Sequence, residues 1–102
     1  MPAAEDTIQG VSVACRPERG WVTIMGRLDG ATLEYPVVEL AVLSPEREKL
    51  AETMIVDAPP EFQMTLHLHD VPVGVPLILR VEVHQGDSSV ALREYSFDYA
   101  PE

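Results

Sequence analysis

The sequence predicts an all-β protein built as a seven-stranded antiparallel sandwich of two sheets. Apolar and polar residues alternate with a period of two along most of the chain, and residues 62–69 (FQMTLHLH) show it most clearly, with an apolar side chain at every even position. Because successive side chains of a strand point to opposite faces, this octet has one face for a core and one for water. Gly, Pro and Asp interrupt the alternation at regular intervals, which is typical of short strands joined by turns.

Turn signals divide the chain into seven such segments. The predicted strands span residues 8–15, 21–28, 36–43, 50–56, 62–69, 76–84 and 90–99. The first strand ends at a run that contains Pro17 and Gly20, and the second ends at Asp29-Gly30, a strong turn pair. Pro36 opens the third strand, a position where proline is tolerated.

Helix-start signals precede the fourth strand. Ser44 is suited to cap a helix and Pro45 to occupy its first position, and acidic residues follow. A single helical turn is therefore expected over residues 44–49. A longer helix is not expected, because residues 53–56 (TMIV) are rich in β-branched side chains and end at Asp57.

The seventh strand changes phase. Its apolar positions are even at Val90 and Leu92 and odd at Tyr95, Phe97 and Tyr99. A β-bulge produces such a one-residue change, and bulges are common at sheet edges. We therefore expect this strand at an edge or crossing between the sheets, with Phe97 in the core.

One face of the first, second, third, fifth and sixth predicted strands supplies the predicted core. In the second strand both faces are apolar, with Trp21 and Met25 on one and Val22 and Ile24 on the other, so alternation alone does not fix its register. The predicted core residues are Val11, Val13, Val22, Ile24, Leu28, Val38, Leu40, Val42, Phe62, Met64, Leu66, Leu68, Leu77, Leu79, Val81 and Val83.

Length and composition indicate one domain. A chain of 102 residues can bury a core without disulfide bonds. We expect the domain at residues 8–99, with tails at 1–7 and 100–102. Seventeen acidic residues against seven basic ones give a formal net charge of −10. This balance argues against nucleic acid as a partner, since Lys and Arg neutralise phosphate, and against anionic membrane surfaces.

Targeting signals are not evident. No apolar run approaches the ~18 residues of a membrane span, and the acidic N-terminus lacks the features of a signal peptide. If the N-terminus is native, we expect the protein in the cytoplasm. Cys15 is the single cysteine and cannot form an internal disulfide. We expect it to be a small buried side chain.

Two motifs carry a resemblance that extends over the whole chain. They are Gly20-Trp21-Val22-Thr23-Ile24 and the series Gly74-x-Pro76-Leu77-x-Leu79-x-Val81-x-Val83. With these motifs and its seven strands, the chain resembles the immunoglobulin-like or fibronectin type III-like modules common in bacteria. The resemblance implies a β-sandwich but no activity, because such folds serve many unrelated functions.

His67 and His69 are the candidate metal ligands. They are two residues apart on the fifth predicted strand, so both imidazoles project from one face. That spacing suits Zn²⁺, Cu²⁺ or Ni²⁺, with Asp70 or His84 as a third ligand. Solvent-facing histidines on an alternating strand are the ordinary alternative.

The loop carboxylates are a second candidate. If strand direction alternates, odd and even loops collect at opposite ends of the sandwich. One end then holds Asp29, Asp57 and Asp87, and the other holds Arg16, Arg19, Arg47 and Lys49. The acidic end is a candidate for a basic partner or for Ca²⁺, although no loop has the spacing of a dedicated calcium loop.

Trp21 is the candidate aromatic contact. In one interpretation its ring is exposed and contacts a partner protein or a sugar ring. In the other it packs over the end of the core. No catalytic motif or phosphate-binding loop is present, so we expect no enzyme activity and no cofactor.

The sequence favours a non-catalytic protein-interaction module or small structural subunit that acts through a sheet face or an edge strand. Pairing of edge strands would make it a homo-oligomer. The alternatives are a module that binds carbohydrate or another small ligand, and a metal-binding module that uses His67 and His69.

Overall fold

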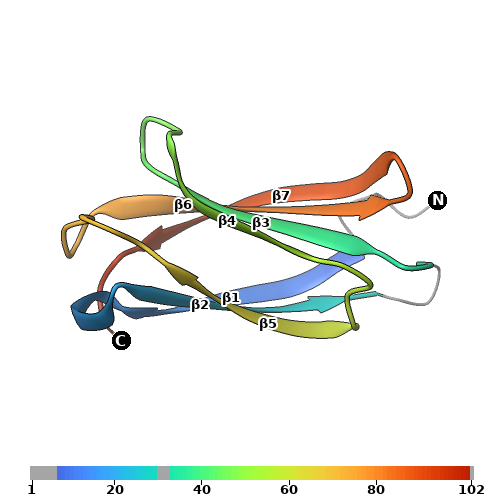
Figure 1. Ribbon diagram of the computed structural model, residues 1–102, viewed down its shortest axis with the longest axis horizontal. Helices are drawn as coiled ribbons and strands as arrows, with labels where there is room; N and C mark the ends of the chain where they lie inside the picture. The colour runs from blue at the N-terminus through green and yellow to red at the C-terminus, as the bar shows by residue number, and fades with distance from the viewer. Residues whose placement is uncertain (1–6, 30–32, 102) are drawn as a thin grey trace.

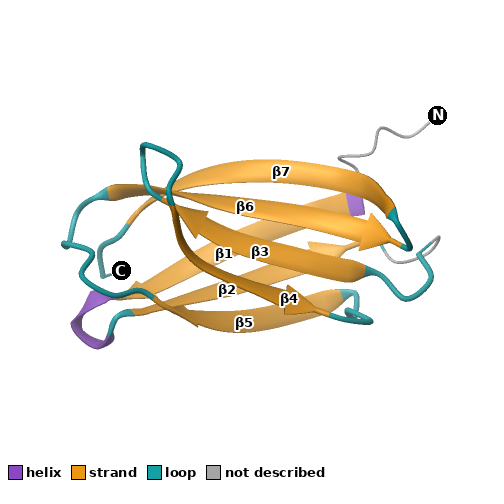
Figure 2. Ribbon diagram, turned by 45° about the horizontal axis from the view of Figure 1, so that its top comes forward, coloured by secondary structure: helices purple, strands orange, loops and turns teal. Residues whose placement is uncertain are grey.

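Two antiparallel β-sheets pack face to face in the computed structural model, which describes residues 7–29 and 33–101 (Figure 1). The strands are β1 (Ile8–Arg16), β2 (Trp21–Leu28), β3 (Val37–Leu43), β4 (Lys49–Ile55), β5 (Glu61–His67), β6 (Pro76–Gln85) and β7 (Ser88–Asp98). One sheet has the order β1-β2-β5 and the other β4-β3-β6-β7, and Figure 2 shows the two layers. The predicted seven-stranded, two-sheet sandwich is confirmed.

The prediction of a helical turn over residues 44–49 is wrong. A tight turn joins β3 to β4 instead, in which the Arg47 amide donates to the Ser44 carbonyl at 2.8 Å and the Ser44 hydroxyl accepts from the Glu48 amide at 3.0 Å. Arg47 has a φ of 67°, which lies outside the right-handed helical region. The described residues instead contain a short 3₁₀ helix, η2 (Pro17–Arg19), between β1 and β2.

The core agrees closely with the prediction. All predicted core residues are buried except Val11, Val13 and Met64, which are partly buried. These three lie on β1 and β5, the edge strands of the three-stranded sheet, beside which no further strand of the described residues pairs. Cys15 is buried, as expected, and Ile8 and Tyr99 are buried core residues that the pattern did not identify.

β7 lies at the edge of the four-stranded sheet. The pairing of β6 with β7 is irregular near the start of β7. Val83 pairs with Ala91 and His84 pairs with Ser89, so Val90 is an extra residue without a partner position on β6. The phase change is therefore at Val90 and not between Leu92 and Tyr95 as predicted. Leu92 consequently points to solvent, and Phe97 is only partly buried.

Strand direction alternates along the chain, so loops collect at two ends of the molecule. β2, β4 and β6 finish at the right-hand end in Figure 1, and β1, β3 and β5 finish at the left-hand end. The molecule measures 41 Å along its longest axis and about half that across. In the part of the chain that the structure describes, no helix is long and apolar enough to span a membrane. The predicted tails fall largely on residues 1–6 and 102, outside the described residues.

Candidate functional site

The outer surface of the β1-β2-β5 sheet, here called the three-stranded face, is built from rows of side chains that face one another across the strands. These rows are Arg16-Trp21-His67, Ala14-Thr23-Thr65, Ser12-Met25-Gln63 and Gly10-Arg27-Glu61. The hydroxyls of Thr23 and Thr65 lie 3.1 Å apart at hydrogen-bond distance, and Arg27 pairs with Glu61 at 3.0 Å. The two middle rows carry no charged side chain.

Trp21 lies at one end of this face and points away from the core. Its indole N–H donates to Nε2 of His67, and the guanidinium carbon of Arg19 lies 5.3 Å from the centre of its ring. The rings of His67 and His69 are 5.8 Å apart. Trp21 is partly exposed, so the structure favours the surface contact over the cover of the core.

The hydrogen bond between Trp21 and His67 disfavours metal binding by His67 and His69. Because Nε2 of His67 accepts from Trp21, that lone pair is engaged. His84 is on the outward side of β6 in the other sheet, so it cannot complete a site with them. No third His, Cys or carboxylate of the described residues gathers with this pair in a ligand-sized group. Metal binding by His67 and His69 stays a prediction without a third ligand.

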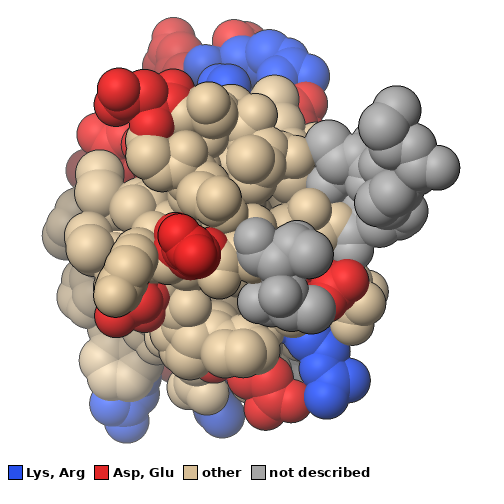
Figure 3. Space-filling view, turned by 90° about the vertical axis from the view of Figure 1, so that its right-hand side faces the viewer, with Lys and Arg blue, Asp and Glu red and all other residues tan. Residues whose placement is uncertain are grey.

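Asp29, Asp57 and Asp87 follow or join strands at the end where β2, β4 and β6 finish. Viewed from that end, acidic side chains form separate groups among uncharged residues (Figure 3). None of these three belongs to a ligand-sized group of the described residues. They share one end of the sandwich, but their use for a cation or a partner stays a prediction.

The predicted separation of charge along the long axis is weakened by ion pairs. At the end that was expected to be basic, Arg47 pairs with Glu94 and Lys49 with Glu52. Charge differs more between the two faces. On the outer surface of the β4-β3-β6-β7 sheet, here called the four-stranded face, two adjacent rows are Met54-Glu39-Glu82-Leu92 and Glu52-Ala41-Arg80-Glu94. They hold four carboxylates and one guanidinium.

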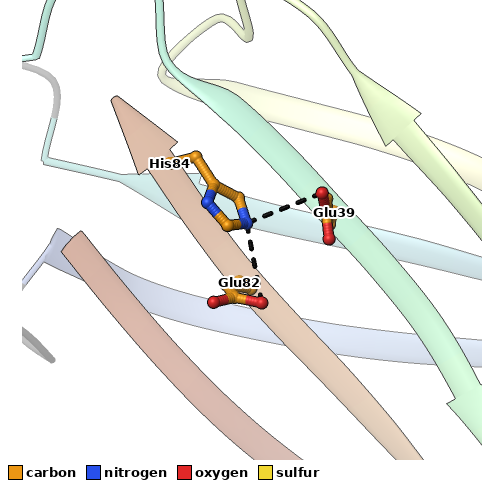
Figure 4. Close-up of side chains that lie close together, drawn as sticks. All are labelled: Glu39, Glu82 and His84. Carbon is orange, nitrogen blue, oxygen red and sulfur yellow. Dashed lines mark ion pairs between the residues drawn. The ribbon is translucent and has the colours of Figure 1, made fainter. Parts of the chain in front are cut away.

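Glu39, Glu82 and His84 converge on the four-stranded face (Figure 4). Nε2 of His84 lies 3.6 Å from a carboxylate oxygen of Glu39 and 3.5 Å from one of Glu82. Glu39 and Glu82 face each other across β3 and β6, and His84 lies two residues after Glu82. This is the only group of three metal-ligand side chains in the described chain whose ligand atoms lie within 4.8 Å of one another.

Sequence reasoning missed this cluster. The alternation of β6 did place Glu82 and His84 on one solvent-facing side, since they are two residues apart. Glu39 is about forty positions away, and only the pairing of β3 with β6 brings it near. Glu39 and Glu82 also line a shallow groove of about 490 Å³ that extends toward Lys49, Met54 and Arg80.

Comparison with solved structures shows a similar fold. The crystal structure of Ruminococcus gnavus β-glucuronidase matches 89% of this chain with a TM-score of 0.65 and 16% sequence identity, as does the same enzyme in complex with D-glucaro-d-lactam. Its apo structure matches with a TM-score of 0.60 and 15% identity. This chain spans only 15% of the length of that enzyme. No protein-family model matches the sequence, and no curated protein does.

Proposed function

We propose that this chain is a non-catalytic interaction module that binds a partner protein through the three-stranded face. The observation that carries the proposal is the combination of Trp21 and the half-exposed Met25 on the central strand of a face whose two middle rows are uncharged. Protein interfaces are enriched in aromatic residues and Met, and their centres are poor in charge. In a chain with a net charge of −10, such a face is unusual.

The strand order supports a closer relation to fibronectin type III-like modules. β4 pairs with β3, in the sheet that contains β6 and β7. In constant-type immunoglobulin domains the fourth strand instead lies in the sheet of the first and second. We therefore favour the fibronectin type III-like alternative within the sandwich architecture.

A carbohydrate-related role is the second candidate, favoured by the side chains around Trp21. An aromatic ring with Arg19 and His67 beside it offers both a stacking surface and polar groups. The structures with a similar fold are named β-glucuronidases, which supports accessory binding of sugars that contain glucuronic acid. Such a ligand would use the same end of the three-stranded face.

A matched pair of variants tests the first proposal. Met25→Glu places a charge in the middle of the three-stranded face, and Leu92→Glu makes the same change on the four-stranded face. Their side chains are 42% and 47% exposed, so both variants should fold. We expect a partner retained from a soluble extract by the wild-type chain to be lost with Met25→Glu and kept with Leu92→Glu. Calorimetry with the purified partner should then show that it binds Met25→Glu more weakly than it binds the wild-type chain or Leu92→Glu. Equal retention by both variants would reject the three-stranded face.

Intrinsic fluorescence tests the second candidate. Trp21 is the only tryptophan, so its emission reports directly on this end of the face. A saturable change upon addition of glucuronic acid oligosaccharides, absent with neutral oligosaccharides of the same length, supports sugar binding. An unchanged spectrum at millimolar oligosaccharide would exclude it.

A further inference from the structure

We propose that Glu39, Glu82 and His84 form a binding site for a divalent transition-metal ion of the Zn²⁺ type. The site lies on the four-stranded face, on the opposite side of the sandwich from Trp21. It is therefore independent of the partner-binding role proposed above.

The separations of the ligand atoms suit an ion between them. The distances of 3.6 and 3.5 Å from Nε2 of His84 to the two carboxylate oxygens are too long for good hydrogen bonds. In a tetrahedral Zn²⁺ site with metal–ligand bonds near 2.1 Å, neighbouring ligand atoms are about 3.4 Å apart. The two distances from His84 are close to this value, and all three ligand atoms lie within 4.8 Å of one another, so side-chain movements of about 1 Å would complete the coordination.

The burial of the His84 ring nitrogen adds to this argument. Its Nε2 atom is buried from solvent and has no hydrogen-bond partner among the described residues. Buried ring nitrogens normally have a partner, since an unmade hydrogen bond costs free energy. Figure 4 shows this nitrogen directed toward the two carboxylates. A metal ion at that point would accept the lone pair of the neutral imidazole.

The two carboxylates also favour a cation. Glu39 and Glu82 are direct cross-strand partners on neighbouring strands, where like charges destabilise the sheet. Arg80 offsets part of this repulsion, with its guanidinium 3.8 Å from the Glu82 oxygen that faces His84. The Arg80 side chain is 45% exposed, so it has room to turn away from the cluster. A divalent ion would neutralise both carboxylates at shorter range.

Ser89 positions one of the ligands. Its hydroxyl donates to Oε2 of Glu82 at 2.7 Å, so Oε1 is left to face His84. Hydrogen bonds of this kind orient metal-binding carboxylates and contribute about ten- to a hundredfold to affinity. Imidazole with two carboxylates suits Zn²⁺ better than Ca²⁺ or Mg²⁺, which prefer oxygen ligands alone. Three protein ligands leave a fourth position for water.

Calorimetry with Zn²⁺ on the chelator-treated protein tests the site, together with the visible spectrum of the Co²⁺ form. We expect one equivalent of Zn²⁺ to bind, and the intense absorption bands of four-coordinate Co²⁺ to appear. His84→Gln and Glu82→Gln should each weaken Zn²⁺ binding by at least about tenfold. The matched control is the double variant His67→Gln/His69→Gln, which removes the other histidine pair and should bind Zn²⁺ like the wild type.

Ser89→Ala keeps the test decisive if a ligand variant does not fold. This exposed hydroxyl is outside the core, and its loss should weaken Zn²⁺ binding by about tenfold while the melting temperature in chelator stays unchanged. The proposal is overturned if the wild type binds no Zn²⁺ at micromolar concentration. It is equally overturned if binding is lost in the His67/His69 variant and kept in the His84 and Glu82 variants.

Discussion

The aromatic ring of Phe62 fills the space in which a side chain at Gly26 would stand. The two residues are direct cross-strand partners on β5 and β2. A Cβ atom built on Gly26 would lie 2.2 Å from Cζ of Phe62 and within 2.8 Å of both neighbouring ring carbons. Glycine at this position therefore leaves room for the tip of the Phe62 ring, which is buried in the core.

We predict that Gly26→Ala lowers the free energy of unfolding by about 1–3 kcal/mol, because the Phe62 ring must shift within a packed core. Urea denaturation measures the change. Gly10→Ala is the control, since a Cβ there meets no atom within 4 Å, and its stability should be unchanged or raised by up to about 1 kcal/mol. If Phe62 is the cause, Gly26→Ala should have much less effect in a Phe62→Leu background. An equal loss in both backgrounds would contradict the explanation.

Tyr95 offers a stabilising substitution. Its hydroxyl is buried and has no hydrogen-bond partner among the described residues. Because a buried, unpaired polar group costs about 1–3 kcal/mol, Tyr95→Phe should raise the free energy of unfolding by about 1 kcal/mol. Tyr35→Phe is the control, since Tyr35 is 77% exposed and should show no change. A loss of stability in Tyr95→Phe would mean that an ordered water satisfies the hydroxyl.

The strands could be predicted from the sequence because each depends on its own alternation and on the turns beside it. The register of β2 could not, because both of its faces are apolar. In the structure Gly26 of β2 faces Phe62 of β5, a fit between residues on two separate strands that alternation along one strand does not show. The position of the irregularity in β7 has the same origin, since it is fixed by pairing with Val83 and His84 of β6.

For the candidate sites too, single residues could be predicted from the sequence, but contacts that depend on strand pairing could not. Trp21 and His67 were identified singly, but their contact requires the pairing of β2 with β5. The charge prediction considered loops alone. It missed that Arg47 reaches Glu94 and that carboxylates gather on one sheet face, because both depend on strand order.

The pair of Arg47 and Glu94 should make stability depend on pH. Two hydrogen bonds of 2.7 and 2.8 Å from the Arg47 guanidinium hold the pKa of the Glu94 carboxyl below its usual value. A carboxyl whose pKa is lower in the folded state stabilises the fold above its unfolded-state pKa. This contribution is lost as the pH falls through the folded-state pKa.

We therefore expect Arg47→Gln to be less stable than the wild type at neutral pH and equally stable in acid, where Glu94 is protonated. Carboxyl ¹³C titration should show the midpoint of Glu94 rising in the variant. Arg16→Gln removes the same charge at a site with no ion pair in the described chain, and should leave the Glu94 midpoint nearly unchanged. A Glu94 midpoint that is the same in wild type and Arg47→Gln would refute the role of the pair.

β7 is the edge strand through which we predict self-association. It is the last strand of its sheet, and Leu92 on it is 47% exposed. An unpaired edge can add a strand from a second copy, which would join two four-stranded sheets. The net charge of −10 opposes this encounter. Salt should therefore strengthen association, since the screening length falls from about 8 Å at physiological ionic strength to about 3 Å at 1 M.

Sedimentation velocity over a range of concentrations and salt decides between edge pairing and a monomer. We expect the dimer fraction to rise with the protein concentration and with the salt concentration. Leu92→Lys should reduce the dimer fraction, because a lysine on an edge strand disfavours pairing with another strand. Met25→Lys makes the same change on β2, the central strand of the other sheet, and should leave the dimer fraction unchanged. A wild-type chain that stays monomeric at the highest concentration in 1 M salt would exclude pairing through β7. A dimer lost with Met25→Lys and kept with Leu92→Lys would instead place the contact on the three-stranded face.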